Sequence, residues 1–161
     1  MPLHDATDDD DGMAPAGAGR ANVPRRDDWP SIGEDGDMPV VLVVDDDAGL
    51  RAAVRRALER RAYIVIEAAG GRDALALLGD GLAVDYVVTD LRMADGSGGW
   101  LLAQIGYEYP HLLERIVVMS GDTAATAAAH LATRWRCPVL RKPFSAPQLA
   151  GTLAGLARRA G

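Results

Sequence analysis

Five short apolar runs alternate with segments of helical periodicity from Pro39 onward, and this alternation constrains the fold more than any other feature. A continuous run such as Val40–Val44 is typical of a strand that is covered on both faces. Leu50, Val54 and Leu58 then recur at the spacing of one helix face. Strands that alternate with helices predict a parallel sheet with right-handed crossovers. We therefore expect an α/β fold, a doubly wound five-stranded parallel sheet with helices on both faces.

The expected elements are placed by their composition and by local stop signals. Gly79-Asp80-Gly81 closes one helix, and Ser145 and Gln148 have the spacing of a capping box. An aspartate after the first strand, Asp46 or Asp47, is expected to cap the first helix. The expected strands are Val40–Val44, Tyr63–Glu67, Val84–Thr89, Arg115–Met119 and Val139–Arg141, and the later helices are Gly71–Leu78, Trp100–Tyr107, Ala124–Trp135 and Ala146–Arg159.

Charge divides the chain into two parts. Residues 1–38 carry ten acidic and three basic side chains, a net charge of −7, whereas residues 39–161 carry 13 acidic and 14 basic ones. The first part has almost no large apolar residues, so it cannot bury enough surface to offset the entropy of ordering. We expect residues 1–38 to form a disordered acidic tail and residues 39–161 to form one folded domain. The near-neutral charge of that domain does not favour nucleic acid as a partner.

Two further classes of protein are disfavoured. No apolar run approaches the ~20 residues that a membrane span requires. The first residues lack the basic and apolar regions of a signal peptide. The single cysteine, Cys137, excludes an internal disulfide and a cysteine-based metal site. These features predict a cytoplasmic protein without membrane insertion.

Polar side chains follow four of the five predicted strands. Asp45 and Asp46 follow the first strand, Asp90 the third, Ser120 the fourth and Lys142 the fifth. Because the carboxyl ends of parallel strands meet at one edge of a sheet, these side chains are expected to lie close together. Each of them also fits an ordinary structural role, an aspartate as a helix cap or the serine in a turn. Their combination in this order favours a functional site.

The chemistry of these side chains indicates phosphoryl transfer. Neighbouring carboxylates repel one another, and a divalent cation that prefers oxygen ligands, such as Mg2+, relieves that repulsion. One of the carboxylates would act as the nucleophile, Lys142 would neutralise phosphoryl oxygens, and Ser120 would offer a hydroxyl to hold the product. We therefore expect phosphoryl transfer to a carboxylate at this edge.

The motifs around these residues resemble those of response-regulator receiver domains of two-component signalling, over residues 39–160. Val41–Asp46 resembles the family's first strand and acidic pair, and Val87–Met93 resembles its phosphoacceptor strand. Gly98 falls at the family's loop glycine, Val117–Gly121 resembles the fourth strand with its Ser/Thr, and Lys142-Pro143-Phe144 resembles the Lys-Pro-aromatic signature. The resemblance implies a flavodoxin-like sheet with the strand order 2-1-3-4-5.

The resemblance also implies a metal site. Asp90 would be the phosphoacceptor. Asp46 and Asp90 would bind Mg2+ through their carboxylates, and Asp45 would help directly or through water. The backbone carbonyl of Arg92 would complete the protein ligands.

The remaining family roles concern the phosphoryl group and its donor. Lys142 would contact the phosphoryl group, Ser120 would follow it on activation, and the Lys142-Pro143 peptide bond would be cis. The expected donor is a sensor histidine kinase or a histidine phosphotransfer protein, and the expected output is contact with an unknown downstream protein. The resemblance implies no enzyme, apart from catalysis of the chain's own phosphorylation and slow dephosphorylation.

Some positions depart from the family pattern. Ala94 stands where most members have proline, and Val139 stands at the position of the switch aromatic. A β-branched side chain has little rotamer freedom, so the usual aromatic relay from the serine is not expected. No output domain is expected, because the chain ends at Gly161 just after the last helix. Arg92 and Asp122 are expected to pair across the site and to hinder the water that hydrolyses the phosphoryl group.

Two other functions are consistent with parts of the sequence. A haloacid-dehalogenase-like phosphatase would use Asp45 and Asp47 as its Asp-x-Asp motif, but no acidic residue follows Lys142 to serve as its later metal ligands. A receiver fold that takes no phosphate would act as an interaction module, and Val139 keeps this alternative open. Within the receiver interpretation, the chain resembles either a stand-alone regulator or relay protein, or the C-terminal receivers of hybrid sensor kinases.

Overall fold

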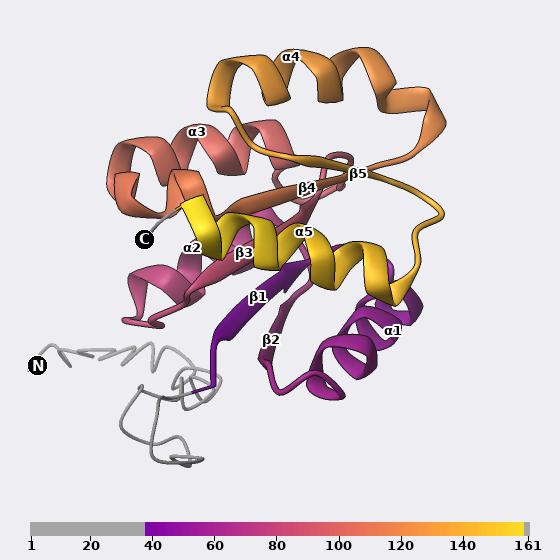
Figure 1. Cartoon of the computed structure of the whole chain (residues 1–161). Helices are drawn as coiled ribbons and strands as arrows, with labels where there is room; N and C mark the ends of the chain where they lie inside the picture. Colours follow the sequence, from indigo (N-terminus) through magenta and orange to yellow (C-terminus); the bar gives the residue numbers. More distant parts are fainter. Residues whose placement is uncertain (1–37, 160–161) are drawn as a thin grey trace, which may run out of the picture.

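A five-stranded parallel sheet forms the centre of the protein (Figure 1). The computed structural model describes residues 38–159. Its strands run in the order β2-β1-β3-β4-β5, and every neighbouring pair is parallel, which confirms the predicted fold class and strand order. The strands are β1 (Val40–Val44), β2 (Ile64–Ala68), β3 (Tyr86–Asp90), β4 (Ile116–Ser120) and β5 (Val139–Arg141).

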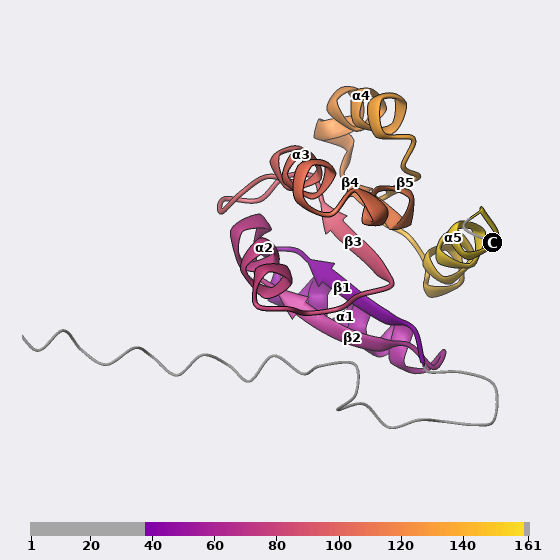
Figure 2. The same cartoon turned by 90° about the vertical axis from the view of Figure 1, so that its left-hand side faces the viewer.

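Helices cover both faces of the sheet (Figure 2). One face packs against α1 and α5, and the other packs against α2, α3 and α4. The helices are α1 (Ala48–Glu59), α2 (Gly71–Gly79), α3 (Gly98–Glu108), α4 (Ala125–Trp135) and α5 (Ala146–Arg159), with short 3-10 helices η2 (Pro110–Arg115) and η3 (Asp122–Ala124). Among residues 38–159, no helix is both long enough and apolar enough to cross a membrane.

The core lies in two layers that the strands separate. Val41 and Val43 of β1 belong to the layer under α1 and α5. Leu42 and Val44 belong to the opposite layer. All four side chains are fully buried, because successive residues of a strand point to opposite faces and both faces are covered. This double burial explains why β1 has a continuous apolar sequence instead of an alternating one.

The helix starts follow the predicted capping signals. The Asp47 carboxylate accepts a hydrogen bond from the Leu50 N–H at 3.0 Å and so caps α1. Before α5, the Ser145 N–H donates to Gln148 Oε1 at 2.7 Å, and the Gln148 N–H donates to Ser145 Oγ at 3.2 Å. This reciprocal pair is the predicted capping box.

The differences from the predictions are local. Three strands begin one or two residues later than predicted, and the 3-10 helix η2 was not predicted, because such short turns leave no periodic pattern. The Lys142-Pro143 peptide bond is cis, as predicted. The predicted disordered tail, residues 1–38, lies outside the described residues except for Met38, so it stays a prediction.

The turn between α1 and β2 contains a backbone conformation that suits glycine. Ala62 has φ of 59°, in the left-handed region that costs an L-residue about 1–2 kcal/mol. We predict that Ala62→Gly raises the free energy of unfolding by about 1 kcal/mol, measured by urea denaturation. Ala53→Gly, at an exposed interior position of α1, is the matched control and should lower it by about 1 kcal/mol. Equal destabilisation by both variants would contradict the prediction.

Candidate functional site

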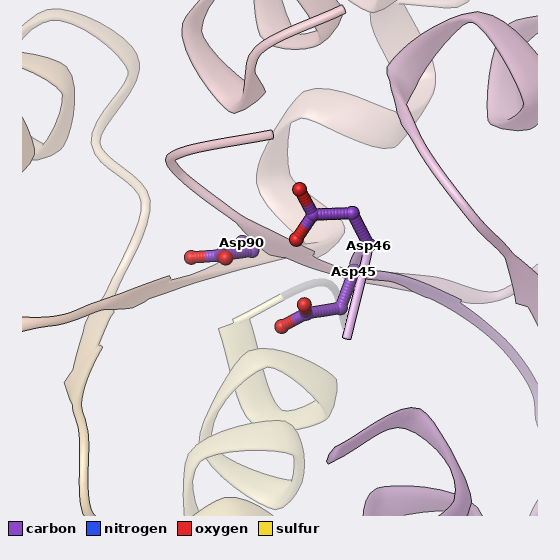
Figure 3. Close-up of side chains that lie close together, drawn as sticks. All are labelled: Asp45, Asp46 and Asp90. Carbon is purple, nitrogen blue, oxygen red and sulfur yellow. The ribbon is translucent and has the colours of Figure 1, made fainter. Parts of the chain in front are cut away.

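The polar residues at the strand ends meet at one edge of the sheet. Asp45 follows β1, Asp90 ends β3, Ser120 ends β4, and Lys142 follows β5. The carboxylates of Asp45, Asp46 and Asp90 offer ligand atoms that all lie within 4.8 Å of one another (Figure 3). The predicted convergence of these three carboxylates is therefore confirmed.

The Lys142 ammonium group joins two of the three carboxylates. Its Nζ lies 3.1 Å from Asp45 Oδ2 and 3.3 Å from Asp90 Oδ2. The side chain of Asp45 is 1% exposed and that of Lys142 is 26% exposed, so water screens this contact poorly. The lysine thus holds the ends of β1, β3 and β5 together through charge.

Burial and pairing act in opposite directions on these groups. Burial raises the pKa of the Asp45 carboxyl, even though the Asp47 N–H and Lys142 both favour its charged form. For Lys142, burial lowers the pKa, but the hydrogen bond and charge of Asp45, together with Asp90, outweigh burial and raise the pKa above its ordinary value. The lysine therefore stays charged at neutral pH. Its charge is what makes a buried aspartate tolerable at position 45.

Backbone contacts fix the two buried carboxylates. The Asp47 N–H donates to Asp45 Oδ1 at 2.8 Å, and the Leu91 N–H donates to Asp90 Oδ1 at 2.8 Å. Gly98 packs directly on the backbone of Asp90, and a Cβ at this position would overlap the Asp90 carbonyl oxygen. Glycine at position 98 is thus required for the chain to turn into α3 beside the acidic cluster.

Ser120 is buried at the end of β4, next to the fifth strand. Its carbonyl accepts a hydrogen bond from the Lys142 N–H at 2.8 Å. This bond holds the backbone of Lys142 beside the end of β4. Its hydroxyl donates to the Gly121 carbonyl at 3.1 Å. The hydroxyl is therefore engaged locally in this state, and its predicted movement toward a phosphoryl group stays a prediction.

Arg51 contributes to the site in a way that the sequence reading missed. The side chain of Arg51 is only 17% exposed, and its Nη1 donates to the Asp45 carbonyl at 2.6 Å. Its Nε also lies 3.4 Å from Glu67 Oε1. Arg51 lies one helical turn after the Asp47 cap. A long side chain at this spacing can reach back to the end of the preceding strand, and this was the only hint of its contact in the sequence.

The loop after β3 borders the exposed carboxylate of the cluster. The Ala94 N–H donates to Asp46 Oδ2 at 3.3 Å, and Asp46 and Arg92 line the same open pocket. The Arg92 guanidinium donates to the Thr123 carbonyl at 2.9 Å, so it reaches across to the loop after β4. The side chain of Asp122 lies outside the described part of the chain. The metal-ligand role of the Arg92 carbonyl and the predicted Arg92–Asp122 pair both stay predictions.

The acidic cluster fits a divalent cation. Its three carboxylates carry more negative charge than one lysine neutralises, and all of the donors are oxygens. Asp46 is exposed while Asp45 and Asp90 are buried, so one side of the cluster is open to solvent. Mg2+ keeps several waters and needs only one or two protein carboxylates, which suits a half-open cluster.

A comparison with known protein families matches most of the described part of the chain. Residues 41–154 match the response regulator receiver domain. The chain belongs to the response regulator receiver family. Membership of this two-component signalling family agrees with the strand order and with the acidic edge, and it leaves the dehalogenase-like phosphatase without support.

Curated relatives contain the receiver domain as one part of a larger protein. Over 114 residues the chain is 36% identical to the sensor kinase CckA of Brucella abortus, covering 70% of this chain and 12% of that protein. It is 32% identical to the transcriptional regulator NtrC of Rhizobium meliloti, covering 70% of this chain and 23% of that protein. It is 34% identical to the response regulator MprA of Mycolicibacterium vanbaalenii, covering 76% of this chain and 52% of that protein. The match thus spans between about a tenth and a half of the length of these relatives.

Solved receiver structures agree with this fold. A response regulator receiver protein from Pseudomonas putida is 31% identical, with a TM-score of 0.67, and covers 75% of this chain and 99% of that one. A receiver domain from Clostridium thermocellum is 25% identical, with a TM-score of 0.69. The match covers 76% of this chain and 96% of that one.

The pairing of Lys142 with Asp45 predicts a stability effect. We expect Lys142→Met to lower the free energy of unfolding by about 3 kcal/mol, because it leaves a buried aspartate without a partner. Arg158→Met on the exposed face of α5 should stay within about 0.5 kcal/mol of the parent. The double variant Asp45→Asn/Lys142→Met should be more stable than Lys142→Met alone, since it removes the stranded charge. If chemical denaturation shows no such recovery, the pair does not act as described.

Proposed function

We propose that this receiver accepts a phosphoryl group on Asp90 from a phosphohistidine of a sensor kinase or a histidine phosphotransfer protein, in a Mg2+-dependent reaction. The observation that carries the proposal is the position of Lys142, which contacts Asp90 at 3.3 Å inside a cluster of three carboxylates. The chain then signals through protein contacts with an unknown downstream partner, without nucleic acid and in the cytoplasm.

The chemistry assigns one role to each side chain. Asp90 Oδ1 is held by the Leu91 N–H, so Oδ2, which faces Lys142, is the attacking oxygen. The new bond joins Oδ2 to phosphorus, and the phosphorus–nitrogen bond of the phosphohistidine breaks as its imidazole takes up a proton. Lys142 neutralises a phosphoryl oxygen, and Ser120 supplies a hydroxyl to another. Bound Mg2+, held by Asp46, Asp90 and the Arg92 carbonyl with help from Asp45, would supply further positive charge to the phosphoryl oxygens.

This reaction makes the protein a signalling component and not a turnover enzyme. It catalyses its own phosphorylation and slow dephosphorylation. The alternative of a receiver fold that takes no phosphate is disfavoured by the complete set of Asp45, Asp46, Asp90, Ser120 and Lys142.

The acceptor assignment predicts a site-specific adduct. With acetyl phosphate and Mg2+, the protein should gain the mass of one phosphoryl group, measured on the intact chain. Asp90→Asn should abolish this gain, because an amide cannot attack phosphorus. Asp80→Asn, an exposed aspartate at the end of α2, should leave the gain unchanged. A normal adduct on the Asp90→Asn protein would rule out this acceptor.

The metal assignment predicts a contrast between two adjacent aspartates. Asp46→Asn should weaken Mg2+ binding by about tenfold or more, because it removes a carboxylate ligand. Asp47→Asn should change it little, because Asp47 lies outside the cluster and asparagine still caps α1. Binding is measured by isothermal titration with MgCl2. Equal affinity in both variants would contradict the role of Asp46.

A further inference from the structure

A cavity of about 270 Å³ lies between α4 and β5, next to the phosphoacceptor edge. Four alanines of α4 line it together with Ser120, Val139 and Arg141. β5 is the edge strand of the sheet, and α4 lies beside it (Figures 1 and 2). An apolar cavity of about 150 Å³ is large enough for a benzene ring, so this one has room for a larger aromatic side chain.

The cavity exists because the residues around it are small. Ala128 is the one buried residue of α4, and the neighbouring positions that face the sheet are also alanines. Val139, on the opposite wall, is shorter than the aromatic residue that the family pattern has at this position. The N-terminus of α4 has no side-chain cap, and its C-cap Arg136 has φ of 54°, the left-handed conformation in which helices commonly end.

The C-terminal part of the chain, to which this cavity belongs, is rich in basic residues. From Thr123 to the C-terminus the sequence contains six Arg or Lys residues and neither Asp nor Glu. Arg141 lines the cavity, and Arg134 and Arg136 are exposed near the end of α4. An occupant with an aromatic group and neighbouring negative charges would match both the cavity and its surroundings.

The chain itself contains such a sequence. Residues 27–37 read Asp-Asp-Trp-Pro-Ser-Ile-Gly-Glu-Asp-Gly-Asp, with five acidic side chains and no basic one. Trp29 is the one aromatic residue of the first 38. It lies 11 residues before Val40, a length of chain that extends to roughly 36–40 Å. A domain of this size has a radius of gyration of about 14 Å, so a chain of this length can pass from β1 to α4.

We propose that the first part of the acidic segment 27–37, residues 27–32, docks on the α4–β5 surface and places the Trp29 indole in the cavity. Asp27 and Asp28, just before the indole, then face Arg141 and the arginines at the end of α4. Because Ser120 lines the same cavity, the indole contacts a residue of the phosphoacceptor site. Docking and phosphorylation are then coupled, and each changes the equilibrium of the other by the same factor. The docking itself does not depend on the proposed phosphorylation.

NMR of the full-length chain tests the docking. In a 1H–15N spectrum, Trp29→Ala should remove one indole signal and shift the backbone amides of α4 and β5, while those of α1 and α2 stay in place. Ala129→Leu, which fills the cavity from an exposed position, should move the Trp29 indole signal to its position in the urea-unfolded chain. Thr126→Leu, on α4 but outside the cavity lining, is the matched control and should leave the signal in place.

Charge and concentration supply the second part of the test. Arg141→Glu and high salt should both release the Trp29 signal, because both weaken attraction to the acidic segment. Arg158→Glu on α5 is the control and should leave the Trp29 signal unchanged. An unchanged α4–β5 spectrum in Trp29→Ala would overturn the proposal. Loss of docking on dilution would also overturn it, because the occupant would then be the segment of a second copy.

Discussion

The contact of Lys142 with Asp45 and Asp90 is the interaction on which the acidic edge depends. Placing carboxylates at the ends of two adjacent buried strands costs free energy through repulsion and desolvation. One lysine, 3.1 Å and 3.3 Å from the two carboxylates, offsets part of that cost and leaves an excess of negative charge. That excess suits a divalent cation, and it is consistent with the phosphoryl transfer proposed for Asp90.

Much of this arrangement could be predicted from the sequence. The alternation of five apolar runs with helical segments was enough to predict the parallel sheet, and the meeting of strand ends then placed Asp45, Asp90, Ser120 and Lys142 together. The capping box at Ser145 gave the correct start of α5, and Asp47 is the one of the two candidate aspartates that caps α1. These features were accessible because each depends on local sequence or on a general rule of parallel sheets.

Other features depend on packing that no local pattern records. Arg51 belongs to an arginine-rich helix, and only the tertiary fold shows that its guanidinium turns back to the Asp45 carbonyl. The cavity between α4 and β5 results from small residues on two elements that pack against each other, so neither element predicts it alone. The position of Val139 was noticed in the sequence as a missing aromatic, but the space that it leaves is visible only in three dimensions.

The edges of the sheet set limits on how two copies of this protein can meet. β5 is three residues long, with Pro138 just before it and Pro143 two residues after it. A strand this short, bounded by residues without a backbone N–H, is a poor template for strand addition. Self-association through a continuous intermolecular sheet is therefore disfavoured at this edge. Copies that associate on this side of the molecule must do so through helix surfaces, which separate and re-form without disturbing the core.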